Sequence, residues 1–137
     1  MTQEDKELLL KDLCARLPYG VKAYVKHWSK IDRKYYEDTY VVKSVFPSLN
    51  EVHVQSKSGS VDVLLGYSDY NIKPYLFPLS SMNEEQKKEL QSLMIHDSYG
   101  ILYHTIESFD WLNKNHFDYR GLIEKSLALD ATGLNIY

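Results

Sequence analysis

The sequence predicts an α+β domain: a small antiparallel sheet, or a partly closed β-barrel of SH3 or Sm size, flanked by an N-terminal helix and C-terminal helices. The hydrophobic period changes from about 3.6 residues to about 2 near residue 20 and becomes helical again after residue 81. Between these points, alternating segments follow one another through short turns, which is typical of an antiparallel meander. We therefore expect one domain over residues 1–137, with a helix at 1–17, a β-rich part at 20–78 and a helical part at 81–130.

The composition is that of an ordinary globular chain. Hydrophobic residues make up 44% and charged residues 26% of the 137 positions, which excludes a disordered chain. No apolar run approaches the ~18 residues of a membrane span and no signal-peptide pattern is present, so we expect a cytoplasmic protein with no membrane partner. The single cysteine, Cys14, favours a reducing compartment because it has no partner for an internal disulfide.

Charge and tyrosine are distributed unevenly. The net charge is −3, but residues 1–34 carry eight Lys and Arg against five Asp and Glu, while residues 81–137 carry five against nine. Tyrosine supplies 12 of the 18 aromatic residues, which suits both strand packing and a recognition surface. The acidic total gives the whole chain no attraction to nucleic acid, so any such site must be local.

The first element is expected to be a helix over residues 2–17. Thr2 can cap it, and Pro18 and Gly20 end it. Its apolar positions recur at three- and four-residue spacing: Leu9, Leu10, Leu13 and Leu17. Cys14 borders this stripe, so we expect a small buried hydrophobe there rather than a nucleophile.

Four strands are then expected, at residues 20–28, 35–46, 51–57 and 61–67. Turn sequences lie between them at residues 47–50 and 58–60. Short connections require antiparallel neighbours, since parallel strands need long crossovers. The next segment, residues 69–78, contains Pro74 and Pro78 and predicts an extended edge segment rather than a central strand.

The last third of the chain is expected to be mainly helical. Ser81 and Glu84 have the spacing of a capping box, which predicts a helix from residue 81 to about residue 95. Residues 101–106 are too few to distinguish a helix from a strand. A helix over residues 108–116 follows, and Asp118 can cap a final helix over residues 119–129.

No catalytic motif is present. The six glycines form no phosphate-binding loop, and no nucleophile elbow occurs. The five histidines lack the spacing of a metal site, so we expect no metal and no cofactor. An enzyme is the least favoured class, although a pocket that gathers His96, His104 and His116 would support one.

The strongest candidate site is the outer face of the first strand. Basic and aromatic residues alternate along it and continue into the next turn as Lys22, Tyr24, Lys26, Trp28 and Arg33. Cations interleaved with aromatic rings can neutralise phosphates and stack on bases, so a nucleotide or short nucleic acid is the expected ligand. The alternative is a solvated strand face on which lysine stems cover the rings.

Two aromatic loops form a second candidate, a surface for a protein partner or for self-assembly. They cover residues 67–77 and 117–120 and contain Tyr70, Tyr75, Phe77, Tyr119 and Arg120. The alternative is that these rings close the core between sheet and helices. The sequence pattern gives Arg120 no role in packing, so its guanidinium group can pair with a carboxylate or bind an anion.

Three stretches carry a resemblance to a known group of proteins: LCARLPYGV at residues 13–21, KPYLFPLSSM at 73–82 and FDYRGLIEKSLAL at 117–129. In order and spacing they resemble a family of small uncharacterised proteins of Bacteroides-type gut bacteria and their phages and mobile elements. The resemblance covers nearly the whole chain, with residues 22–70 as the variable part. It implies no activity or catalytic residue, but it implies a short cytoplasmic protein that binds a host component in takeover or defence evasion.

The sequence therefore favours a non-enzymatic binding module. Its first expected ligand is a nucleotide or nucleic acid on the strand face, and the alternative is a protein partner, of the host or of its own kind, on the aromatic loops.

Overall fold

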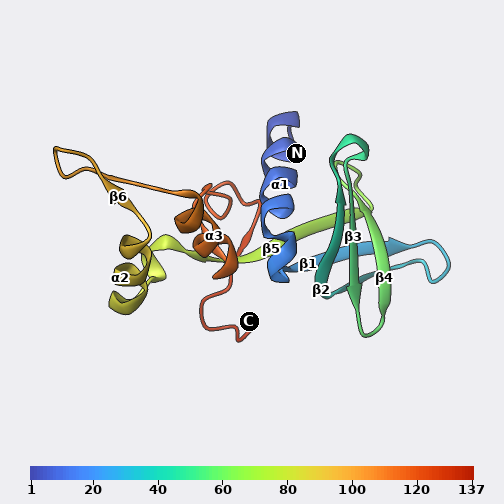
Figure 1. Ribbon diagram of the computed structural model, residues 1–137. Helices are drawn as coiled ribbons and strands as arrows, with labels where there is room; N and C mark the ends of the chain where they lie inside the picture. The colour runs from blue at the N-terminus through green and yellow to red at the C-terminus, as the bar shows by residue number, and fades with distance from the viewer.

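The computed structural model describes all 137 residues and has an α+β fold (Figure 1). The helices are α1 (Gln3–Arg16), α2 (Glu84–Ser92) and α3 (Ile106–Lys114). The main strands are β1 (Lys22–Ser29), β2 (Lys34–Phe46), β3 (Glu51–Ser56), β4 (Gly59–Leu64) and β5 (Tyr70–Pro78). Four two-residue strands follow: β6 (Ile95–His96), β7 (Leu102–Tyr103), β8 (Phe117–Asp118) and β9 (Leu129–Asp130).

Seven of the strands form one open, mainly antiparallel sheet. Strands β1 to β4 make the predicted meander, and the full order is β4-β3-β2-β1-β5-β8, with β9 also paired to β5. Of the two expected forms, the antiparallel sheet is confirmed and the partly closed barrel is wrong. Both β8 and β9 run parallel to β5 and pair with it, whereas β4 pairs only with β3, so the two ends of the sheet do not join.

The core lies between the inner face of the sheet and a layer made by α1 and the segment after β8. Its fully buried members include Leu9 and Leu13 of α1 and Val25, Val52 and Val54 of the sheet. A smaller cluster joins α3 to β8 and contains Met82, Trp111, Leu112 and Phe117. The molecule is elongated, with α2 and β6 at one end and the β1–β2 hairpin at the other (Figure 1).

Helix α1 confirms the N-terminal prediction. Thr2 caps it in a capping box with Asp5, and Leu9, Leu10 and Leu13 are buried. Cys14, however, is exposed, so its expected burial is wrong. The buried face of α1 is centred on Leu9 and Leu13, and Cys14 lies about 100° around the helix from Leu13, toward solvent.

Strand β5 is not at the edge of the sheet, which corrects the expectation for residues 69–78. It lies between β1 and β8, with Pro74 opposite Ala23. Pro74 is the last residue of β5 that pairs with β1, and Pro78 is the last residue of the strand. Proline has no backbone N–H to donate, and both prolines of β5 lie where its pairing with a neighbouring strand ends. The two prolines therefore do not interrupt the sheet.

The helical part also differs from the prediction at both ends. Helix α2 begins at Glu84 and is capped by Asn83, in a capping box with Gln86, so Ser81 is not the cap. The predicted final helix over residues 119–129 is absent. The Asp118 carboxylate does accept hydrogen bonds from the N–H groups of Leu122 and Ile123, both at 2.9 Å, but the turn that starts there ends at Ser126, whose φ of 60° is not helical.

Candidate functional site

A two-stranded arm extends from the body of the molecule beyond α2 and α3 (Figure 1). We define the arm as residues 95–103, comprising β6, its connecting turn and β7. Residues 101–106, which the pattern left ambiguous, contain β7 and the start of α3, with Thr105 as its cap. The arm pairs with no strand of the main sheet, so most of its surface is open to solvent.

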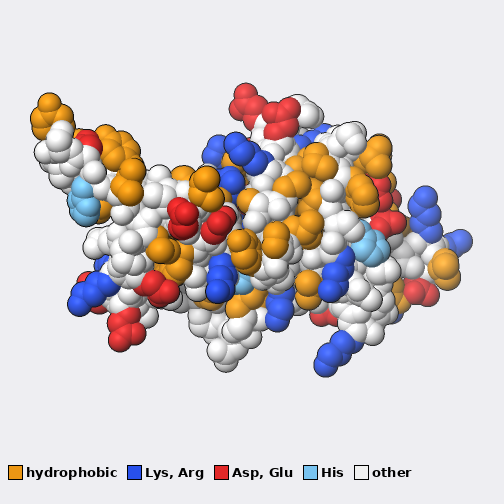
Figure 2. All heavy atoms as spheres, in the orientation of Figure 1, with side chains coloured by type: hydrophobic (Ala, Val, Ile, Leu, Met, Phe, Trp, Pro, Cys, Tyr) orange, Lys and Arg blue, Asp and Glu red, His pale blue; other side chains and the backbone are white.

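Apolar side chains cover one face and the tip of this arm. Ile95 lies opposite Tyr103 in the β6–β7 ladder, and directly opposed residues share one face of a ribbon. Ile101 lies two residues before Tyr103 and therefore points to the same face. All three are exposed, and Tyr99 at the tip is 88% exposed. Figure 2 shows the hydrophobic atoms at this end of the molecule.

The turn of the arm is held by one carboxylate. Asp97 accepts hydrogen bonds from the backbone N–H of Tyr99 and of Ile101, each at 2.9 Å, and from the Tyr103 hydroxyl at 3.0 Å. The backbone donor at Ile101 is the main cause of a lowered pKa of Asp97. At the base, the Thr105 hydroxyl donates to the Leu93 carbonyl at 2.6 Å. The arm thus presents its apolar face on an ordered backbone.

The sequence contained a signal for the arm. Asp97 and Gly100 bound a four-residue turn between apolar residues, and Gly100 adopts φ 79°, which glycine tolerates best. The flanking apolar runs are too short for a periodicity argument, because each strand of the arm has two residues.

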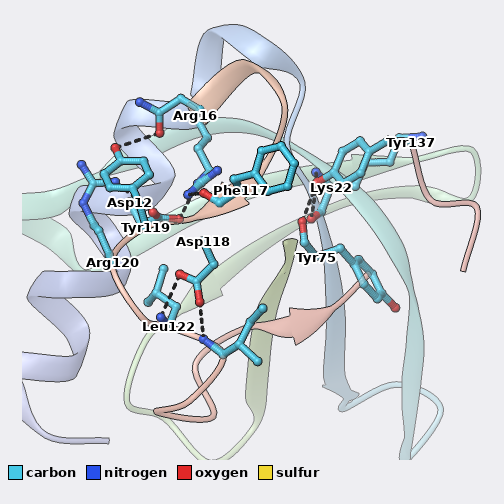
Figure 3. A network of polar contacts seen from close by, with 12 residues as sticks. Asp12, Arg16, Lys22, Tyr75, Phe117, Asp118, Tyr119, Arg120, Leu122 and Tyr137 are labelled. Atoms are coloured by element: carbon cyan, nitrogen blue, oxygen red, sulfur yellow. Dashed lines mark hydrogen bonds and ion pairs between the residues drawn. The ribbon is translucent and has the colours of Figure 1, made fainter. Parts of the chain in front are cut away.

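The predicted basic and aromatic face of β1 exists, but parts of it have partners within the chain. Lys22 donates from its ammonium group to the Ile136 carbonyl at 2.8 Å, and its backbone N–H donates to the Tyr137 hydroxyl at 2.8 Å. The Tyr137 hydroxyl in turn donates to the Tyr75 carbonyl, which fastens the C-terminal segment across β1 and β5 (Figure 3). Lys22 is therefore used in holding that segment.

Tyr24 is also engaged on this face. Its hydroxyl donates to the Glu37 carboxylate at 2.7 Å, and this hydrogen bond is the main reason that the pKa of Tyr24 rises to about 12. Glu37 lies opposite Lys26 in the β1–β2 ladder, so a carboxylate stands among the predicted cations. The face carries less positive potential than the strand sequence alone implies.

The free part of the face is a small cluster at the end of β1. Trp28 packs edge-on against Tyr35 with ring centroids 4.9 Å apart, and the Lys26 ammonium group lies 4.8 Å from the centre of the Tyr35 ring. Tyr35, which sequence reasoning did not select, joins because it lies opposite Trp28 on β2. Arg33 lies in the hairpin turn, exposed and with φ 54°, beyond this cluster.

The residues of the two aromatic loops point mostly into the protein. Tyr75 is buried, Tyr70 packs against the main core, and Phe77 and Tyr119 pack against the smaller cluster. The Tyr119 hydroxyl donates to the Asn113 side chain at 3.0 Å. Their positions agree with the alternative in which these rings close the core.

Arg120 belongs to a buried ionic network (Figure 3). It donates to one oxygen of the Asp12 carboxylate at 2.9 Å, while Arg16 donates to the other oxygen at 2.8 Å. The guanidinium of Arg16 also donates to the Phe117 carbonyl at 2.6 Å. Asp12 and Arg16 have no exposed surface, so this network joins α1 to the segment after α3 from inside the fold.

The histidines are not grouped as metal ligands. No group of three or more His, Cys, Asp or Glu side chains is placed to hold a metal ion. His104 packs on Phe109, whereas His116 is buried and stacks on Tyr137 with ring centroids 3.6 Å apart. The pocket that His116 helps to line contains neither His96 nor His104.

Comparisons with protein-family models, with curated proteins and with solved structures found no match to this chain. None of its helices combines the length and apolar character needed to cross a membrane. The structure itself therefore describes this protein as an α+β domain with a projecting apolar arm.

Proposed function

We propose that this protein is a protein-interaction module that docks through its arm. The observation that carries the proposal is the concentration of exposed apolar side chains on and beside the arm: Ile95, Tyr99, Ile101, Tyr103 and Ile106. Isolated exposed hydrophobic residues are common on monomers, but several gathered on one projecting element are typical of an interaction surface.

The order of the arm supports this function. A two-stranded ribbon alone is marginally stable in water, yet Asp97 and Thr105 supply hydrogen bonds that hold the turn and the base. An ordered surface loses less conformational entropy on binding than a flexible one. Tyrosine is also enriched at the buried centres of interfaces.

A photo-crosslinking amino acid in place of Tyr99 is expected to give specific adducts. The matched control is the same replacement at Tyr67, which is 64% exposed but lies outside the arm, in the turn between β4 and β5. Adducts are measured by mass spectrometry, with purified protein and with extract of expressing cells. Adducts from position 99 and not from position 67 agree with arm docking; equal yields at both positions, or none at 99, contradict it.

The cluster of Lys26, Trp28 and Tyr35 supports a second candidate, binding of single-stranded nucleic acid. Its cation and two rings lie on one face of a hairpin, as a stacking platform requires. We expect Trp28→Ala to weaken binding of a labelled oligonucleotide of about 16 bases by roughly tenfold or more, as read by fluorescence anisotropy. Tyr67→Ala is the control, and circular dichroism reports on folding. Unchanged affinity in Trp28→Ala excludes this face.

A further inference from the structure

We propose that the pocket beside His116 binds a small organic anion that carries a planar ring. The pocket is bounded by α2, α3, the end of β5 and the C-terminal segment, and its volume of about 480 Å³ is typical of a small-molecule site. Its walls carry two aromatic rings, two side-chain amides, two aliphatic hydroxyl groups, one imidazole and one ammonium group, and no carboxylate. None of these groups belongs to the arm, so this site is separate from the proposed docking surface.

The imidazole of His116 is the observation that points to a ligand. The residue is 7% exposed, and its Nδ1 is fully buried without a hydrogen-bond partner. The other ring nitrogen, Nε2, also has no partner within the chain but is not fully buried, so this edge of the ring meets the pocket. Buried polar side chains without hydrogen bonds are rare and costly, and a ligand in the pocket supplies the missing partner.

The charges around this imidazole favour an anion. Burial is the main cause of the lowered pKa of His116, and the positive charges of Arg16 and Lys22 add to it. Arg16 and Arg120 share the single carboxylate of Asp12, so their network keeps one positive charge in excess, and Nη1 of Arg16 has no acceptor. Lys22 donates to a backbone carbonyl and not to a carboxylate. The field at the pocket is therefore positive, which attracts a negatively charged ligand.

The polar groups that remain free in the pocket suit an oxyanion. Lys114 takes part in none of the ion pairs of the chain. Gln86 accepts a hydrogen bond from the Asn83 N–H with its Oε1 at 2.9 Å, so its Nε2 group is left to donate. Asn115 donates from its Nδ2 to the Trp111 carbonyl at 2.9 Å, which leaves its Oδ1 as an acceptor. The pocket thus offers ammonium and amide donors to an oxyanion, and one acceptor to a donor on the same ligand.

The aromatic walls favour a ligand with a planar ring. The rings of Phe77 and Tyr137 have centroids 6.1 Å apart, and Tyr137 also stacks on His116. The Tyr137 hydroxyl accepts from the Lys22 backbone N–H and donates to the Tyr75 carbonyl, so this wall is held in place (Figure 3). A pocket of this volume with aromatic walls is better filled by an anion attached to a ring than by a bare inorganic ion.

Titration of the isotope-labelled protein with phenyl phosphate, followed by NMR chemical shifts, tests the inference. We expect saturable shifts gathered at the backbone amides of residues 114–116 and 132–133, which line the pocket. Lys114→Gln should raise the dissociation constant roughly tenfold, because it removes a charge-assisted hydrogen bond to the oxyanion. The matched control is Lys88→Gln, which removes an exposed lysine charge on α2 outside the pocket and should leave the affinity unchanged. Benzylamine, a cation with the same ring, should not shift these amides.

Several outcomes overturn the inference. One is the absence of saturable shifts at these amides up to about 10 mM phenyl phosphate. Another is an affinity that Lys114→Gln leaves unchanged, or that Lys88→Gln lowers equally, because the pocket cation then plays no part. Equal binding of benzylamine excludes an anion as the preferred ligand. Inorganic phosphate that gives the same shifts with the same affinity leaves no role for the ring and excludes the ligand class.

Discussion

Asp12→Ala is expected to lower the free energy of unfolding by about 3–5 kcal/mol, the range for breaking a buried ion pair from one side. Asp12 and Arg16 have no solvent exposure, and Arg120 shares the same carboxylate. Removing that carboxylate leaves the Arg16 guanidinium buried without a counter-charge. Urea denaturation followed by tryptophan fluorescence gives the measurement.

The matched control is Glu84→Ala, which removes the exposed ion pair between Glu84 and Lys87. We expect a loss of less than about 1 kcal/mol there, because solvent screens exposed pairs. Asp12→Asn keeps the shape and an acceptor oxygen, and should fall between the two. If Asp12→Ala costs no more than Glu84→Ala, the network does not stabilise the junction between α1 and the C-terminal segment.

The second large effect is a loss of stability in acid caused by His116. Burial, with a further contribution from the positive charges of Arg16 and Lys22, lowers the pKa of His116 from 6.5 to about 4. The unfolded chain binds a proton at this imidazole below pH 6.5, whereas the folded chain does so only below about pH 4. Stability from this group is therefore complete above pH 6.5 and is lost as the pH falls through that window, by about 3 kcal/mol in total.

His116→Asn isolates this contribution. His116 adopts φ 62°, a conformation that asparagine accepts, so the replacement suits the backbone. Between about pH 7 and pH 5, the free energy of unfolding should fall by about 2 kcal/mol more in the wild type than in His116→Asn. The comparison cancels the effect of Asp and Glu, which titrate in both proteins. Parallel pH profiles in the two proteins contradict a buried neutral imidazole.

The candidate surfaces were predictable only in part. Alternation along residues 22–28 correctly placed Tyr24, Lys26 and Trp28 on one face, because side chains in a strand alternate between its two sides. The same pattern does not predict which residues of neighbouring segments lie beside that face. Glu37 reduces the charge of that face and the C-terminal segment occupies Lys22, and both are tertiary contacts.

The sequence by itself determined the helix α1, the meander of β1 to β4 and the α+β class. These elements depend on a capping residue, a periodic stripe and turns between neighbouring strands, all of which are local. Tertiary structure alone decided the centre of the fold. Phe117 pairs beside Phe77 and Leu129 beside Tyr75, and these long-range parallel pairs keep the sheet open and make β5 a central strand. No strand of the main sheet pairs with the arm, and the apolar face of the arm is exposed.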